Sequence, residues 1–214
     1  MIKCILFDSD GTLVDSEYLG HLCMEHQLQE IGIQENAASM KEKFRGWKLG
    51  ALLESLQQKH NYKFDELFIY DYRSALNIMF KNQLKATPGI LAALQKIDLP
   101  ICVASSGPMS KITLAMKVTG LQKYFGKQLF SAYDIDSWKP EPDLFLHAAK
   151  SMGFEPKNCL VVEDSLVGLQ AALAANMTVI HYNPEKGPSL KHESVTEIYH
   201  MDQLNQTIIK VKNQ

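Results

Sequence analysis

Two carboxylates near the amino terminus, Asp8 and Asp10, are spaced as residues that could bind a cation together. They follow an apolar run, 2–7, of the kind found in strands buried on both faces. Residues two apart on a strand project from the same face, and Gly11 permits a sharp turn, so both acids should lie at the strand's carboxyl end. Such a pair suits a hard cation like Mg²⁺, which leaves room for water and phosphate.

Three further groups of polar residues follow or precede structured segments later in the chain. Ser105 and Ser106 come directly after the apolar run ICVA, and Glu163 and Asp164 come directly after CLVV. Lys139 precedes PEPD, in which two prolines restrict a loop and the start of a helix. Ligands of open parallel sheets bind beyond the carboxyl ends of the strands, so these groups should meet there. They would combine a cation site with hydroxyl, amide and ammonium donors for an anion.

The spacing of apolar residues predicts the elements that position these groups. The first part of the chain has helical spacing without a strand pattern, and we expect helices at 15–31, 36–44, 49–60 and 65–84. After a turn at 86–89, helices and strands alternate, with strands expected at 100–104, 128–130, 158–162 and 178–181. The helices of this second part are expected at 90–97, 110–119, 141–152, 166–175 and from 201 onwards.

This alternation predicts an α/β fold with right-handed crossovers and a doubly wound, mostly parallel, Rossmann-like sheet. The purely helical stretch interrupts that pattern after the first strand. We therefore expect residues 1–14 and 86–214 to form the α/β catalytic core, and residues 15–85 to form a small helical cap domain inserted after the first strand.

Composition argues against several classes of partner. The 214 residues are 46% hydrophobic and include 22 basic and 24 acidic side chains, which gives a formal net charge of −2 and predicts no nucleic-acid binding. No apolar run approaches the roughly 18 residues of a membrane span, and no signal-peptide pattern is visible, so we expect a cytoplasmic protein without a membrane partner. The four cysteines form no CxxC pair and are expected to be buried free thiols. We also expect a monomer.

Four segments, FDSDGTLVDS, VASSG, WKPEPDLF and VVEDSLVGLQAA, resemble in order and spacing the four motifs of the haloacid dehalogenase-like phosphatase superfamily. The helical insert resembles the small cap of its β-phosphoglucomutase-like and phosphogluconate phosphatase-like branch. The resemblance implies that Asp8 is the nucleophile, that Asp10 is the general acid and base, and that Lys139 is a charge clamp.

The same resemblance implies a Mg²⁺ site and a phosphate site. The metal would be bound by Asp8, by Asp10 through its backbone carbonyl, and by Asp164, with Glu163 assisting. Phosphate contacts are expected from Gly11, Thr12, Ser105, Ser106 and Lys139.

The chemistry of phosphate monoesters is consistent with these roles. Asp8 would carry an aspartyl-phosphate that water then removes. Asp10 would protonate the leaving alkoxide and afterwards deprotonate the water. General acid–base catalysis of this kind accelerates a reaction by roughly 10² to 10⁴-fold. Because the first step needs the proton in place at neutral pH, we expect the pKa of Asp10 to be raised.

The segment FRGWK in the insert is the candidate for substrate selection. Arg45 and Lys48 could bind a second anionic group of the substrate, such as a carboxylate; the alternative is a solvated loop between helices. For Lys111, which follows the serines, no role in specificity is favoured.

These observations predict a Mg²⁺-dependent phosphatase acting on a small phosphorylated substrate, either a sugar phosphate or a sugar-acid phosphate, with 6-phosphogluconate as the first to test. One alternative is a β-phosphoglucomutase-type isomerase. Two features argue against this alternative. The chain has DGT where those enzymes resemble DGV. In the first helix of the cap, Gly20 occupies the position where a histidine is expected, and His21 points about 100° away from it. A second alternative is a non-catalytic phospho-receiver, against which Asp10 and the helical insert argue.

Overall fold

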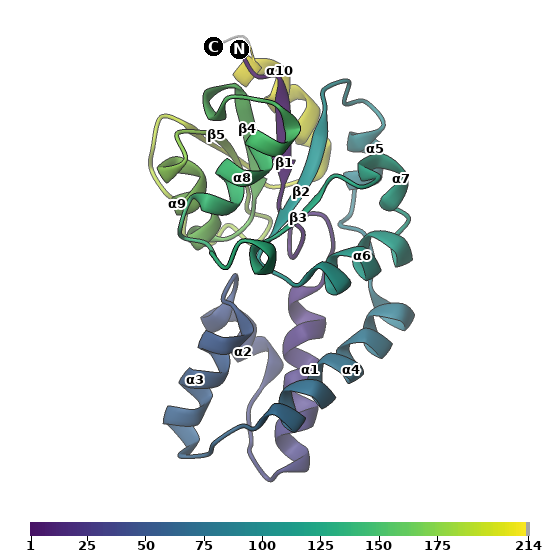
Figure 1. Ribbon diagram of the computed structural model, residues 1–214, viewed down its shortest axis with the longest axis vertical. Coiled ribbons are helices and arrows are strands. Elements are labelled where there is room, and N and C mark those ends of the chain that lie inside the picture. The colour runs from purple at the N-terminus through teal and green to yellow at the C-terminus, as the bar shows by residue number, and fades with distance from the viewer. Residues whose placement is uncertain (213–214) are drawn as a thin grey trace.

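The computed structural model describes residues 1–212 and centres on a six-stranded sheet (Figure 1). The strand order is β3-β2-β1-β4-β5-β6, and all neighbouring strands run parallel. The strands are β1 (Cys4–Phe7), β2 (Ile101–Ser105), β3 (Leu129–Ser131), β4 (Cys159–Glu163), β5 (Thr178–Tyr182) and β6 (Val195–Ile198). The predicted α/β fold with a parallel sheet is confirmed, and β1 lies between β2 and β4.

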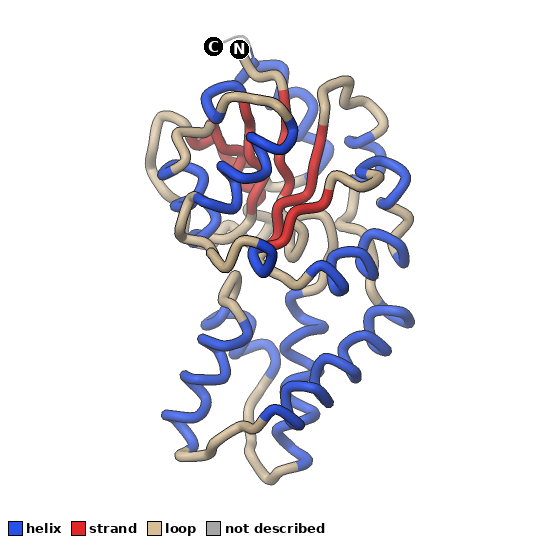
Figure 2. The backbone as a smooth tube through the Cα atoms, viewed as in Figure 1, coloured by secondary structure: helices blue, strands red, loops and turns tan. Residues whose placement is uncertain are grey.

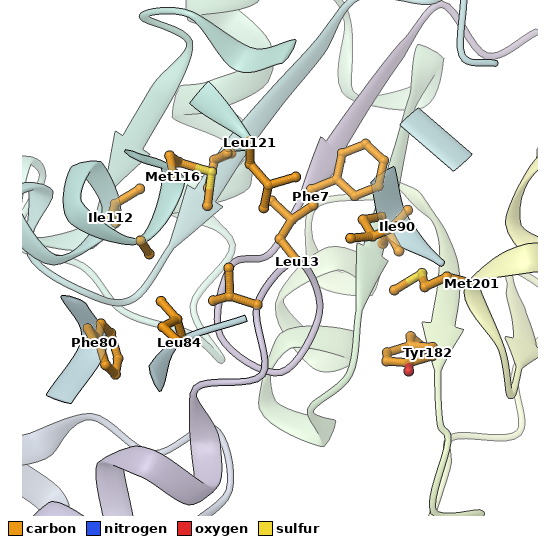
Figure 3. Packing of buried hydrophobic residues seen from close by; sticks show 14 of the residues in the cluster. Phe7, Leu13, Phe80, Leu84, Ile90, Ile112, Met116, Leu121, Tyr182 and Met201 are labelled. Carbon is orange, nitrogen blue, oxygen red and sulfur yellow. The ribbon is translucent and has the colours of Figure 1, made fainter. Parts of the chain in front are cut away.

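Helices cover both faces of the sheet because successive strand side chains point to opposite sides. Ile5 and Phe7 of β1 join one apolar cluster, while Cys4 and Leu6 join another. Figure 3 shows the first cluster around Phe7 and Leu13. The helices that cover the sheet on this side are α5 (Ile90–Leu94), α6 (Met109–Val118), α7 (Gln122–Phe125) and α10 (Leu204–Lys212). The second cluster is covered by α8 (Asp143–Met152) and α9 (Leu166–Ala174).

Four helices between β1 and β2 lie together beyond one end of the sheet (Figure 1, Figure 2). They are α1 (Glu17–Glu30), α2 (Ala37–Phe44), α3 (Leu49–His60) and α4 (Glu66–Gln83). Two of them begin at capping side chains, since Asn36 accepts a hydrogen bond from the Ser39 N–H and Asp65 accepts one from the Phe68 N–H. Each helix lies close to its predicted range.

Two chain segments connect this helical insert to the sheet and run side by side. The Asp15 N–H donates to the Lys85 carbonyl at 3.0 Å, and the Thr87 N–H donates to the Leu13 carbonyl at 3.0 Å. The end of α4 also packs into the first apolar cluster through Phe80 (Figure 3). The insert is thus joined to the sheet through one narrow, hydrogen-bonded crossing.

One strand was not predicted from the sequence. β6 is an edge strand in which only Ile198 is buried, while Thr196 is exposed and Glu197 is half-buried, so no apolar run marks it. Within residues 1–212, no helix combines the length and the apolar character that crossing a membrane requires.

Candidate active site

Lys139 lies between two carboxylates at the carboxyl ends of β1 and β4. Its Nζ is 2.5 Å from Asp8 Oδ1 and 2.6 Å from Glu163 Oε2, and only 3% of its side chain is exposed. Burial alone would lower the pKa of Lys139, but the two carboxylates outweigh it and raise the pKa above its ordinary value. The ammonium group therefore stays charged and can neutralise an anion that approaches Asp8.

Three buried carboxylates, those of Asp8, Glu163 and Asp164, form a candidate metal centre. Each offers an oxygen that lies within 4.8 Å of the others. Burial and the charge of Glu163 raise the pKa of Asp8 well above its ordinary value, and Lys139 offsets only part of this shift. The same two causes raise the pKa of Asp164 to about 7, although Arg45 opposes them. Carboxylates this crowded gain from a divalent cation, so the residues fit Mg²⁺.

Protein donors engage both oxygens of Glu163, and most of these donors belong to the loop that directly follows it. Oε1 accepts hydrogen bonds from the Asp164 N–H, the Ser165 N–H and the Ser165 hydroxyl, at 3.1, 3.0 and 2.8 Å. Gly168 makes room for it, since a Cβ there would lie 2.0 Å from Glu163 Cδ. This arrangement favours a role for Glu163 in orienting Lys139.

The turn after β1 positions Asp164 from the opposite side. Gly11 has a φ of +82°, and a Cβ at this position would lie 2.3 Å from Asp164 Oδ2. The Thr12 hydroxyl donates to Asp164 Oδ1 at 3.0 Å. Both residues were expected to contact phosphate; here they hold the aspartate, and their phosphate contacts stay a prediction.

Asp10 is held by two donors at the edge of the centre. The Ser16 hydroxyl lies 2.5 Å from its Oδ1, and Lys111 Nζ lies 2.8 Å from its Oδ2. Burial would raise the pKa of Asp10, but the Lys111 ammonium, with help from the Ser16 hydroxyl and Lys139, outweighs burial and lowers it. The expectation of a raised pKa is therefore wrong for this arrangement, because α6 brings a cation to the carboxylate. A metal contact through the Asp10 carbonyl stays a prediction.

The two serines after β2 lie in different surroundings. Ser105 is buried, and its hydroxyl oxygen accepts a hydrogen bond from the Gly107 N–H at 3.1 Å. The Gly107 carbonyl in turn accepts one from the Ser131 hydroxyl at 2.7 Å. Ser106 lies in the wall of the adjoining cavity. The loop is thus fixed in place next to Asp10, whereas phosphate binding by the serines stays a prediction.

One cavity extends from the carboxyl ends of the strands to the helical insert. On the sheet side its wall includes Asp8, Asp10, Ser106, Lys111, Lys139 and Glu163. On the insert side it includes Glu17, Gly20, His21, Lys48, Tyr72 and Arg73. The expectation that His21 turns away from the site is wrong, because the cavity follows a wide arc of α1 and both Gly20 and His21 line it.

The two cations of the FRGWK segment point in different directions. Arg45 turns to the acidic centre, where its Nη2 lies 2.9 Å from Asp164 Oδ2, and its Nη1 lies 3.5 Å from Glu185 Oε2. Lys48 lies in the cavity wall, and its Nζ is 4.8 Å from the centre of the Trp138 ring. In this arrangement Lys48 is available to a ligand in the cavity, whereas Arg45 is engaged by carboxylates of the sheet domain.

Two cations line the cavity against or outside the expectations from the sequence: no role was favoured for Lys111, and Arg73 was not considered. Arg73 comes from the exposed part of α4, and Lys111 comes from the first turn of α6. The signal for Lys111 was its position, because the first turn of a helix that follows a strand faces the carboxyl edge of the sheet. For Arg73 the only signal was its helical spacing from the buried residues Leu76 and Phe80.

The sequence is similar to those of known proteins. A family model described as haloacid dehalogenase-like hydrolase matches residues 5–182. A relative named 6-phosphogluconate phosphatase, from Escherichia coli (strain K12), is 35% identical over 206 residues, covering 95% of this chain and 93% of the relative.

Solved structures agree with the fold. A haloacid dehalogenase-like protein from Agrobacterium tumefaciens superposes with a TM-score of 0.83 at 27% identity, over 100% of both chains. A β-phosphoglucomutase from Clostridium difficile gives a TM-score of 0.83 at 21% identity, over 100% of this chain and 98% of the other. At that identity the second likeness concerns the fold alone.

Proposed function

The chain belongs to the haloacid dehalogenase-like hydrolases, and we propose that it is a Mg²⁺-dependent phosphatase of small phosphorylated metabolites. The observation that carries this proposal is the buried Lys139 ammonium beside Asp8, with Asp164 completing an acidic centre. The name of the Escherichia coli relative supports a sugar-acid phosphate, so 6-phosphogluconate is the first substrate to test.

Asp8 is the nucleophile in this proposal. Its carboxylate attacks the phosphorus atom, the bond from phosphorus to the alcohol oxygen breaks, and an aspartyl-phosphate forms. Lys139 lies within hydrogen-bond distance of Asp8 and neutralises the negative charge that the phosphoryl group brings. A Mg²⁺ ion held by Asp8 and Asp164 would supply further neutralisation of phosphate charge as a Lewis acid.

Asp10 exchanges protons with the leaving group and with water. In the arrangement seen here Lys111 keeps it ionised, which is the form that can deprotonate the water attacking the aspartyl-phosphate. Protonation of the leaving alkoxide needs the neutral form. Asp10 therefore gains its proton in the substrate complex, where an approaching phosphate dianion counters the field of Lys111.

Residues 15–85 act as a cap over the cavity. Arg45 reaches from the insert to Asp164, and a Cβ on the adjacent Gly46 would lie 2.7 Å from Ser165 Cβ, so the insert is packed closely on the core. The chain passes between the two parts at the paired segments 13–15 and 85–87. Motion about this crossing would admit substrate and then close the cavity against bulk water.

The test is phosphate release from sugar phosphates and sugar-acid phosphates, with and without Mg²⁺. The wild type should release phosphate only with the metal, and Asp8→Asn should lose at least about 10³-fold in kcat, because an amide cannot form the acyl-phosphate. Asp98→Asn, which changes an exposed aspartate, is the matched control and should keep its activity. Thermal unfolding of both variants establishes that they are folded.

Two results would contradict the proposal. Isomerisation of a hexose phosphate without phosphate release would assign the chain to the mutase alternative, for which the presence of His21 in the cavity wall is the one favourable observation. Full turnover by folded Asp8→Asn would remove Asp8 from the role of nucleophile.

A further inference from the structure

Charged residues line the cavity, but not all of them serve the phosphoryl centre. Each acid in its wall has a partner: Lys139 contacts both Asp8 and Glu163, Lys111 contacts Asp10, and His21 lies 3.6 Å from Glu17. Two cations of the wall remain, Lys48 and Arg73. Neither takes part in an ion pair within residues 1–212.

These two cations reach the cavity from separate elements of the insert. Lys48 directly precedes α3, and the face of the Trp138 ring, next to Lys139 in the chain, lies 4.8 Å from its ammonium group. Arg73 lies on α4, on the same stretch of helix as Tyr72 and Asn77, which also line the cavity. Both residues are exposed and line the insert side of the cavity, away from the phosphoryl centre.

The balance of charge in that space matches one particular kind of anion. Two cations that share a cavity repel each other, and an anion between them removes that repulsion. Among the residues that line the insert side, Lys48 and Arg73 carry two positive charges and Glu17 carries one negative charge, so one positive charge remains. A carboxylate carries one negative charge and fits this balance, whereas a second phosphate dianion would exceed it.

We propose that Lys48 and Arg73 form a carboxylate-binding subsite, which makes phosphate monoesters of sugar acids the substrate class of this enzyme; this rests on the proposed phosphatase function. The guanidinium group of Arg73 can bind a carboxylate through two parallel hydrogen bonds, and Lys48 adds an ammonium group. In this subsite Arg73 takes the place that the sequence analysis gave to Arg45, because Arg45 forms an ion pair with Asp164.

The experiment compares two esters that differ only at the far end of an open-chain sugar. 6-Phosphogluconate ends in a carboxylate, and sorbitol 6-phosphate ends in a hydroxymethyl group. We measure the ratio of kcat/KM for the acid to kcat/KM for the alcohol. In the wild type the acid should be preferred, and Lys48→Met or Arg73→Gln should each lower the ratio by about 10- to 100-fold, the range for a lost hydrogen bond to a charged group.

Two controls separate charge from structure. Arg73→Lys keeps the positive charge and should retain part of the preference, while Lys63→Met removes an exposed lysine before α4 and should leave the ratio unchanged. Equal kcat/KM for both esters in the wild type, or a ratio unaffected by both charge-removing variants, would overturn the subsite.

A binding measurement separates failure of the subsite from failure of the phosphatase assignment. Calorimetry with Asp8→Asn protein, which should not turn over substrate, gives the affinity for each ester directly. Preferential binding of the acid that is lost in Arg73→Gln supports the subsite even when the wild type releases no phosphate. Equal affinity for both esters rejects it even when phosphate is released.

Discussion

Lys111 sets the charge of Asp10, and its removal should shift the pH dependence of turnover. In the proposed mechanism the phosphorylation step needs protonated Asp10, so kcat/KM should fall as pH rises through the pKa of that carboxyl group. Lys111 lowers this pKa. In Lys111→Met the pKa should rise, and the falling limb of the kcat/KM profile should move to higher pH.

Lys111→Met should also lower the free energy of unfolding, because Lys111 lowers the pKa of Asp10. A carboxyl group with a lowered folded-state pKa stabilises the protein above its ordinary value of 3.8, and this contribution is lost as pH falls through the folded-state pKa. Lys111→Met should therefore destabilise the protein by about 1 kcal/mol at neutral pH and by less in acid. Lys111→Arg keeps the charge and serves as the control; an unmoved kcat/KM profile in Lys111→Met would show that the ion pair does not govern Asp10.

Single residues differ in how well the sequence predicts their place. Asp8, Asp164 and Lys139 were expected to meet because each adjoins a strand end or a proline-restricted loop, and the parallel sheet brings such positions to one edge. Lys111 and Arg73 lie on helices, where a cation is most often solvated. Their direction depends on how α4 and α6 pack against the sheet, which local sequence does not state.

Among the elements, the turn that ends β1 controls the acidic centre through Gly11. In Gly11→Ala the new Cβ would lie 2.3 Å from Asp164 Oδ2, at a φ of +82°. We expect a loss of about 1 to 3 kcal/mol in the free energy of unfolding, and weaker Mg²⁺ activation because Asp164 must move. Denaturant unfolding and a Mg²⁺ titration of phosphate release measure the two effects.

Gly32 provides a matched control for this prediction. Its φ is +78°, nearly that of Gly11, but no atom lies within 4 Å of the position of its Cβ. Gly32→Ala should show the backbone strain without any change in Mg²⁺ activation. If both alanine variants responded to Mg²⁺ as the wild type does, crowding against Asp164 would not matter to the metal centre.

The predictability of the elements depends on how strongly they are buried. β1, β2 and β4 are almost entirely buried and read as unbroken apolar runs, and the helices of the insert have an apolar side at regular spacing. β6 lies at the edge of the sheet and is held mainly by backbone pairing with β5, from Val195 to Ile198. Backbone pairing leaves no side-chain pattern, so β6 was missed.

The whole molecule concentrates negative charge at the junction of core and insert. Asp8 and Asp164 come from strands far apart in sequence, and both have a raised pKa because they are buried beside Glu163. An acid with a raised folded-state pKa destabilises the protein once it ionises. The metal-free protein should therefore lose stability as pH rises from the ordinary carboxyl value of 3.8 towards the pKa of about 7 for Asp164.

Mg²⁺ should reverse this loss, and by more at high pH than at low pH. At about pH 8 Asp164 is mostly ionised and the metal displaces few protons from it, whereas at about pH 5 the metal must compete with protons for this carboxylate. With Mg²⁺ at about 100 times its Kd, the stabilisation is about 2.7 kcal/mol, which corresponds to a rise in Tm of roughly 5 to 10 °C. Thermal unfolding with Mg²⁺ and with a chelator, at both pH values, measures the difference.

Asp164→Asn isolates the contribution of the metal centre to this effect. The variant keeps the shape of the side chain but removes one charge, so its metal-free form should be more stable than the wild type at about pH 8, and Mg²⁺ should raise its Tm much less. A rise in Tm that was equal at both pH values, or equal in wild type and variant, would place the stabilising Mg²⁺ outside the centre formed by Asp8 and Asp164. The pH dependence of metal stabilisation thus tests, without any assay of turnover, whether the buried acids that directly follow β1 and β4 hold the metal together.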